Sequence, residues 1–155
     1  MKKKQNYTVD EAQKKLEYYC AYQDRCHAEV IAKLKEMGMI LEARDKIVAD
    51  LIRANYLNET RFSKSFARGK FRIKKWGKNR IIRELKKRGI SDFNIKLGLK
   101  EISENIYQST FYDLFEKRKK ELKELSKVEQ KKKMFYYFSY RGWEHSKIYE
   151  ALAEL

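Results

Sequence analysis

The chain has 155 residues, of which 43% are hydrophobic and 38% charged, with a formal net charge of +15 at pH 7 and no proline. The apolar fraction can build a core, which excludes a wholly disordered chain, and no apolar run approaches the roughly 20 residues of a membrane-spanning helix. Abundant Lys, Glu, Leu and Ala with few turn residues favour an all-α protein, and the high charge favours a thin, elongated body.

Residues 1–7 are a polar start that we expect to be flexible, and they precede no apolar segment of the kind that a secretory signal needs. Thr8 and Glu11 then form a capping-box pattern that predicts the first helix, up to about residue 24. Apolar periodicity predicts two more helices, at about 28–37 and 41–54. We expect these three helices to form a first repeat, residues 8–57.

The same plan follows twice more. Asn58 is the predicted cap of the next helix, and Gly77 breaks it. Ser126 and Glu129 form another capping box. The helices predicted here lie at about 59–75, 78–88, 92–107, 109–125, 128–141 and 144–153. They make a second repeat over residues 58–108 and a third over residues 109–155.

A common register supports three repeats. When Gly38, Gly89 and Gly142 are placed on one another, apolar residues recur at four matched offsets. These residues are Val30, Ile81 and Met134; Ile31, Ile82 and Phe135; Leu34, Leu85 and Phe138; and Met39, Ile90 and Trp143. The register predicts an elongated array of three tandem three-helix repeats, each stacked on its neighbour.

Positive charge is concentrated in the first two helices of the second repeat. Residues 61–88 hold 13 Lys and Arg against one acid, Glu84, and so carry +12 of the formal +15. Like charges three or four residues apart repel, so a face kept basic only for solubility would be a poor design, and we predict a contact surface for a polyanion. We call the candidate residues the central stripe: Arg61, Lys64, Arg68, Lys70, Arg72, Lys75, Trp76, Lys78, Arg80, Arg83, Lys86 and Lys87.

Aromatic residues leave two interpretations open. Trp76 either stacks on a base or a partner side chain, or packs the corner between the two basic helices. Helical spacing places Phe135 and Phe138 in the core, whereas Tyr137 or Tyr140 can be exposed for binding. Residues 131–133 and Arg141 supply a second, weaker basic patch.

Catalytic and metal-binding chemistry have little support in the sequence. Cys20 and Cys26 begin no CxxC pair and the two histidines lack zinc spacing, so we expect isolated buried thiols in a reducing cytosol. Residues 77–79 lack the GxxxxGK[ST] frame of a phosphate loop, and no catalytic triad stands out. We expect neither an enzyme nor a cofactor or metal.

In the order of its motifs the chain resembles the RecX family of recombinase regulators. The second repeat carries NETRF at 58–62, FAR at 66–68, WGKNRI at 76–81, EL at 84–85 and GI at 89–90. The first repeat matches through HAE at 27–29, Leu34, MG at 37–38 and residues 47–62. The end matches through KK at 132–133, Phe138, RGW at 141–143, Ile148 and Leu152. Departures are Lys78 in place of a common proline, Met39-Ile40 after Gly38, and a less acidic loop at 58–60.

The resemblance implies a regulator that binds the RecA recombinase filament on single-stranded DNA, lodges in its helical groove and inhibits recombinase, ATPase and coprotease activities. Such a protein would act in the cytoplasm, in DNA repair, recombination and the SOS response. We expect a monomer, because no apolar stripe is left over. Two alternatives stay open: a helical protein that binds DNA directly without the recombinase, and a helical-repeat adaptor for another acidic protein.

Overall fold

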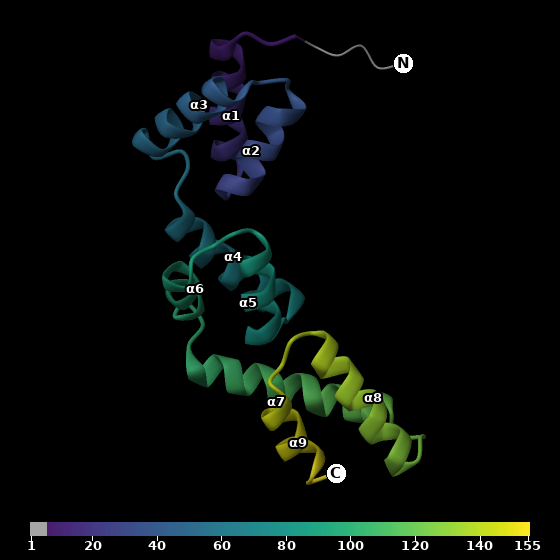
Figure 1. The fold of residues 1–155 in the computed structure, drawn as a ribbon. Coiled ribbons are helices and arrows are strands. Elements are labelled where there is room, and N and C mark those ends of the chain that lie inside the picture. The colour runs from purple at the N-terminus through teal and green to yellow at the C-terminus, as the bar shows by residue number, and fades with distance from the viewer. Residues whose placement is uncertain (1–5) are drawn as a thin grey trace, which may run out of the picture.

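The computed structural model describes residues 6–155, and within that range the chain folds into nine α-helices and no strand. The helices are α1 (Val9–Tyr22), α2 (His27–Glu36), α3 (Leu41–Arg53), α4 (Glu59–Lys74), α5 (Lys78–Lys87), α6 (Asp92–Leu99), α7 (Glu104–Glu121), α8 (Lys127–Tyr140) and α9 (His145–Leu152). Figure 1 shows them in three successive groups of three along an elongated molecule. The predicted all-α repeat array is confirmed. Of the start that we expected to be flexible, residues 1–7, the first five lie outside the described residues.

Polar side chains cap the helices where the sequence predicts them. The Thr8 hydroxyl accepts from the Glu11 N–H at 3.1 Å while the Glu11 carboxylate accepts from the Thr8 N–H at 3.3 Å, a complete capping box before α1. Asn58 accepts from the N–H of Arg61 at 2.9 Å, and Ser126 accepts from the N–H of Glu129 at 3.2 Å. Each of these bonds satisfies an N–H that has no partner inside its helix.

The three aligned glycines end equivalent helices in one way. Gly38, Gly89 and Gly142 have φ of 81°, 72° and 88°, a region in which only glycine is unstrained. The next residue in each case donates its N–H back to the carbonyl five residues earlier, at 3.0 Å in α2, 3.2 Å in α5 and 3.0 Å in α8. The predicted register is therefore present in the backbone as a repeated Schellman-type closure.

The helix boundaries expected at 92–107 and 109–125 are wrong. α6 ends at Leu99, and α7 already begins at Glu104, so that residue 108, the expected end of the second repeat, lies inside α7. The Ser103 hydroxyl accepts from the Ile106 N–H at 3.2 Å and starts a new helix at that point. Ile102, which prolongs the apolar period of α6, is buried from the connecting turn.

Gly98 brings α6 against α4. A Cβ at this position would stand 2.7 Å from the carbonyl oxygen of Ser63, closer than side chains tolerate. The absence of a side chain at Gly98 therefore allows the close packing of the two helices. The contact holds one face of α4 against α6.

The helices enclose two hydrophobic cores. One lies among α1, α2 and α3, with Leu16, Leu34 and Ile47 fully buried. The other runs without interruption from α4 to α9, and includes Ile81, Phe111 and Trp143. The second and third repeats are thus a single packed body. The first repeat joins it through polar contacts and through the buried side chain of Cys26, at the start of α2, which packs in this second core.

The remaining features of the fold concern disulfides, membrane spans and metal ligands. Cys20 and Cys26 are buried free thiols, as expected. Burial raises the pKa of the Cys26 thiol to about 11. In residues 6–155 we find no helix with the length and apolarity to cross a bilayer, and no group of three or more His, Cys, Asp or Glu placed to hold a metal ion.

Candidate polyanion-binding surface

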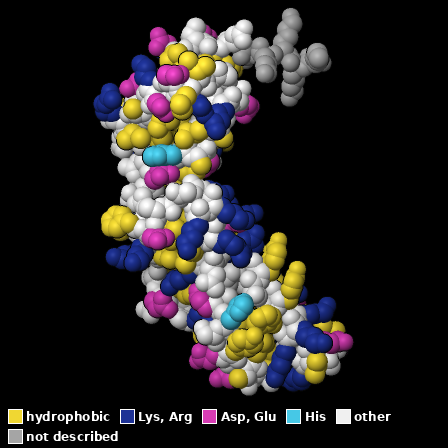
Figure 2. Space-filling model, in the orientation of Figure 1, with side chains coloured by type: hydrophobic (Ala, Val, Ile, Leu, Met, Phe, Trp, Pro, Cys, Tyr) yellow, Lys and Arg dark blue, Asp and Glu magenta, His cyan; other side chains and the backbone are white. Residues whose placement is uncertain are grey.

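The central stripe lies on α4, α5 and the short turn between them. In the space-filling view of Figure 2, dark-blue side chains gather at the middle of the molecule, where these helices lie. Six cations of the stripe are exposed, and the side chains of four of them make no ion pair or hydrogen bond with residues 6–155. These four are Arg72, Lys75, Arg83 and Lys86. They are the part of the stripe that is free to meet an anion.

Arg61, in contrast, is held by its own chain. Its Nε lies 2.7 Å from Oδ1 of Asp24, and its Nη atoms donate to the Asn55 side chain at 3.2 Å and to the carbonyls of Asn55 and Tyr56 at 3.1 and 3.2 Å. This guanidinium donates to Asp24, in the loop after α1, and to Asn55 and Tyr56, in the segment between α3 and α4. Arg61 therefore joins the first repeat to the second. Contact with a partner would have to break that joint.

Three further candidates are paired with acids of the same chain. Arg68 lies 2.6 Å from Glu101, Lys78 lies 3.2 Å from Glu104, and Lys87 lies 3.6 Å from Glu84. Exposed pairs of this kind contribute little stability and can exchange for another anion. These cations are therefore partly neutralised rather than blocked. Lys64 is half-buried and has no such partner in the described chain.

Glu84 is the one acid of the run, and it stays charged. The pKa of its carboxyl lies below the ordinary range, first because Arg88 donates a hydrogen bond to it and also because Lys87 is near. This internal pair removes part of the positive charge at the end of α5.

Trp76 lies at the corner between the two basic helices. It is half-buried, and its ring packs edge-on against Phe66 with centroids 6.3 Å apart. The ammonium of Lys70 lies 5.1 Å from its centroid and the guanidinium of Arg80 lies 4.3 Å away. Of the two interpretations, the packed corner describes this environment. The ring also orients two cations of the stripe through cation–π contacts.

Two neighbours of the stripe were not among the candidates. Lys74 is exposed beside Lys75 and is one of the 13 cations of residues 61–88. The count of charges along the sequence was therefore enough to make it a candidate. The ring of Tyr140, from α8, lies 5.0 Å from the Arg80 guanidinium and extends the stripe into the third repeat. No local sequence signal links residues sixty positions apart.

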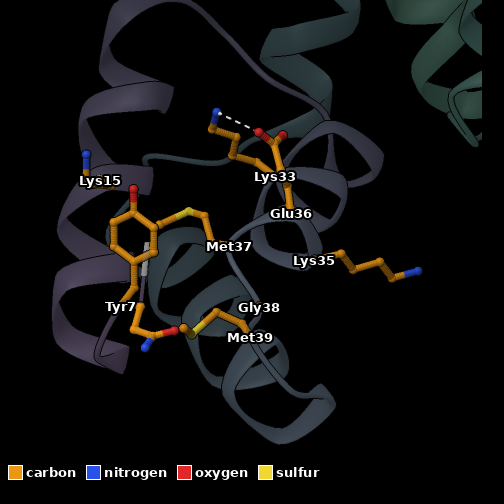
Figure 3. A pocket seen from close by; sticks show the side chains of 9 residues that line it. Tyr7, Lys15, Lys33, Lys35, Glu36, Met37, Gly38 and Met39 are labelled. Atoms are coloured by element: carbon orange, nitrogen blue, oxygen red, sulfur yellow. Dashed lines mark ion pairs between the residues drawn. The ribbon is translucent and has the colours of Figure 1, made fainter. Parts of the chain in front are cut away.

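A separate hollow of about 530 Å³ lies in the first repeat, beside α1 and the end of α2 (Figure 3). Three lysines line it together with Met37 and Met39, and one of them, Lys33, lies 3.9 Å from Glu36. None of its lining residues belongs to the central stripe. The hollow and the stripe are therefore distinct features, on different repeats.

Comparison with known proteins gives matches of sequence and of fold. Residues 58–99 match the family described as RecX, second three-helix domain. The chain is 30% identical over 126 residues to the regulatory protein RecX of Pelodictyon phaeoclathratiforme, covering 80% of this chain and 76% of that protein. It is 35% identical over 98 residues to the regulatory protein RecX of Enterococcus faecalis, covering 63% of this chain and 33% of that longer protein.

A further relative, the regulatory protein RecX of Lactobacillus johnsonii, is 31% identical over 86 residues, 56% of this chain and 32% of its own length. The matched part thus spans about a third of two of these relatives. The crystal structure of RecX from Lactobacillus salivarius superposes with a TM-score of 0.79 at 20% identity, over 95% of this chain and 97% of that one. A second crystal structure, of a regulatory protein RecX, gives the same score at 19% identity, over 95% and 75%.

Proposed function

The chain belongs to the RecX family of regulatory proteins, and on that premise we propose that it binds the RecA recombinase as a filament on single-stranded DNA and inhibits it. Inhibition would extend to recombinase, ATPase and coprotease activities, and so would modulate DNA repair, recombination and the SOS response in the cytoplasm. The protein would act as a monomer, without cofactor or catalytic step. Family membership supports the regulatory role, and the surface supports the kind of partner.

The observation that carries the proposal is a group of exposed cations on α4, α5 and the turn between them that have no ion-pair partner within residues 6–155, namely Arg72, Lys75, Arg83 and Lys86. A filament on DNA offers phosphates and carboxylates along a groove. Arginine binds both groups through two parallel hydrogen bonds, whereas lysine acts as a point charge. We therefore assign the directional contacts to Arg72 and Arg83, and the longer-range attraction to the lysines.

The fold supports this role by keeping the cations in place. α4 and α5 belong to the core that continues through α7, α8 and α9, so the stripe lies on a rigid body about two repeats long. A preorganised surface loses less entropy on binding than a flexible basic tail would. An elongated rigid body can also contact more than one subunit of a filament, which would oppose its growth or favour its disassembly.

The test is recombinase ATPase activity on single-stranded DNA, measured with increasing amounts of the full chain. We expect inhibition at amounts well below one molecule per recombinase subunit, because one bound regulator affects several subunits. Failure to bind or inhibit the filament at both low and physiological salt would contradict the proposal.

A second candidate is direct DNA binding without the recombinase, which the same cations favour through release of counterions from phosphates. Co-sedimentation with recombinase, with DNA, and with both together separates the two. Greater retention on the filament than on bare DNA supports regulation of the recombinase. Equal retention on bare DNA supports the alternative, and retention indifferent to DNA supports an adaptor for an acidic protein.

A further inference from the structure

α8 carries two parallel rows of side chains, each with the four-residue spacing that keeps one face of a helix. The first row is Lys132, Tyr136 and Tyr140, and the second is Lys133, Tyr137 and Arg141. The rings of the first row are 71% and 57% exposed. Each row therefore combines aromatic faces with positive charge, outside the core that Met134 and Phe138 build on the opposite side.

The exposed rings are arranged as a platform. The centroids of Tyr136 and Tyr140 lie 6.0 Å apart, and their planes differ by 19°. Nearly parallel rings on one face leave flat surfaces open to a further ring. In the second row, the guanidinium of Arg141 covers the Tyr137 ring at 3.7 Å, and that of Arg118 lies 4.9 Å from it.

Charge around the platform is of one sign. A groove of about 520 Å³ beside it is lined only by cations and tyrosines: Arg118, Lys132, Lys133, Tyr136, Tyr137 and Arg141. Arg118 is paired with Glu121 at 2.8 Å, whereas within residues 6–155 the ammonium groups of Lys132 and Lys133 have no ion pair. The groove thus offers two ammonium groups next to the exposed ring of Tyr136, and the exposed ring of Tyr140 follows on the same face of α8.

The platform is continuous with the central stripe. The guanidinium of Arg80 lies between the rings of Trp76, at 4.3 Å, and Tyr140, at 5.0 Å. Its Nη1 also donates to the Tyr140 carbonyl at 3.4 Å. One series of alternating rings and cations therefore passes from the second repeat onto α8, along the junction where the two repeats share a core.

We propose that this face of α8 is a binding site for single-stranded nucleic acid, with unpaired bases stacking on Tyr136 and Tyr140 and phosphates meeting Lys132 and Lys133. Base–aromatic stacking beside a cationic groove is the chemistry by which proteins hold single strands. A duplex buries its base faces in its own stack, so it has nothing to offer the rings. An acidic peptide would meet the lysines but not the pair of parallel tyrosines.

The test measures binding of the full chain to a short fluorescent dT oligonucleotide by fluorescence anisotropy. The same measurement is made with a labelled DNA hairpin. The key variant is Y136L/Y140L, which keeps apolar volume and removes the rings. We expect its affinity for dT to fall about tenfold or more, with hairpin binding changed less than twofold. Y136F/Y140F keeps the rings and should bind dT within about twofold of the native chain.

The first repeat provides a matched control. Tyr18 and Tyr22 on α1 are also four residues apart, are each 75% exposed and line a groove with lysines and Arg25. Within residues 6–155, however, their rings do not form a parallel pair like that of Tyr136 and Tyr140, and they are not joined to the stripe. Y18L/Y22L should leave dT binding within about twofold. The proposal is overturned if Y136L/Y140L binds dT like the native chain, if the control pair loses as much, or if hairpin affinity falls equally. Because no recombinase is present, the result is independent of the proposed function.

Discussion

The backbones of Gly77 and Gly142 lie in direct contact across the junction between the second and third repeats, and a Cβ on Gly77 would stand 2.5 Å from the carbonyl oxygen of Gly142. Two backbone hydrogen bonds cross the same contact, from the Gly77 N–H to Arg141 at 2.8 Å and from the Asn79 N–H to Gly142 at 2.9 Å. The turn that joins the two basic helices therefore rests on the turn that ends α8. This contact holds the central stripe in a fixed position relative to the third repeat.

Gly142→Ala should destabilise the protein by about 3–4 kcal/mol. A Cβ there would overlap the backbone nitrogen and Cβ of Arg80, and it would also strain a residue with φ of 88°. The matched control is Gly89→Ala, which has φ of 72° but nothing within 4 Å of its Cβ, so that only the backbone strain of about 1–2 kcal/mol applies. Urea unfolding of the three proteins measures the difference, and equal losses would contradict the contact.

A second link across this junction is the hydroxyl of Tyr107, whose ring is stacked on Trp143 at 4.6 Å. The hydroxyl donates to Glu144 at 2.5 Å and accepts from the N–H of Lys78 at 3.0 Å. Tyr107→Phe leaves the part-buried Glu144 carboxylate and Lys78 N–H without this partner and should cost about 1–2 kcal/mol. Tyr112→Phe on the same helix, with an exposed ring, should change the unfolding free energy by less than about 0.5 kcal/mol.

The same tyrosine predicts a pH dependence. Burial, and then the hydrogen bond to Glu144, raise the pKa of Tyr107 above that of an unfolded tyrosine. The hydroxyl therefore makes its full contribution to the free energy of unfolding below the pKa of an unfolded tyrosine, about 10. This contribution decreases as the pH rises beyond that value. The difference in unfolding free energy between the native chain and Tyr107→Phe should therefore shrink as the pH rises from about 9 to about 11. A difference that stays constant would show that this hydroxyl does not titrate differently on folding.

Arg61 provides several of the polar contacts between the first and second repeats, beside the 3.0 Å bond from the His27 N–H to Glu59 and the buried side chain of Cys26. Arg61→Ala removes its bonds to Asp24, Asn55 and Tyr56, while both hydrophobic cores stay intact. We expect faster hydrogen exchange and proteolysis around residues 54–58, with a loss of about 1–2 kcal/mol in the stability of the first repeat. Arg61→Lys should not restore protection, because an ammonium cannot reach three directions at once. Protection unchanged in Arg61→Ala would place the joint elsewhere.

Local signals in the sequence were sufficient for most of the fold. Cap residues such as Thr8 and Asn58, together with glycines at helix ends, predict seven of the nine helices closely, because these signals act within one helical turn. The boundary near residue 100 failed, because Ile95, Leu99 and Ile102 keep a helical period through a turn. Periodicity reports which side chains are buried, and Ile102 is buried from the turn.

The candidate surface was predictable as a region but not residue by residue. A charge count places the stripe on α4 and α5, yet it cannot show which cations are paired. The acids that hold Arg61, Arg68 and Lys78 lie 37, 33 and 26 positions away in the sequence. Those distances are set by the packing of repeats, and so the free cations become visible only in the folded chain.

The unpaired cations make the sharpest prediction for the proposed function. Arg72→Glu with Arg83→Glu should weaken binding to the recombinase filament at least about tenfold and reduce the salt dependence of binding, because two contacts with anions are lost. Helical content should stay unchanged, since both side chains are exposed and without partners in the described chain. Filament co-sedimentation at several salt concentrations, with circular dichroism, measures both effects.

The control must carry the same change in charge. Lys119→Glu with Lys120→Glu also replaces two exposed cations by acids, on α7 rather than on the central stripe. If general attraction to a polyanion determines binding, the two double reversals should weaken it equally, because each changes the net charge by the same amount. If Arg72 and Arg83 form specific contacts, only their reversal should remove binding, since close contacts depend on position as well as charge. Equal effects would show that the stripe acts only through nonspecific electrostatic attraction. That result would contradict its assignment as the contact surface.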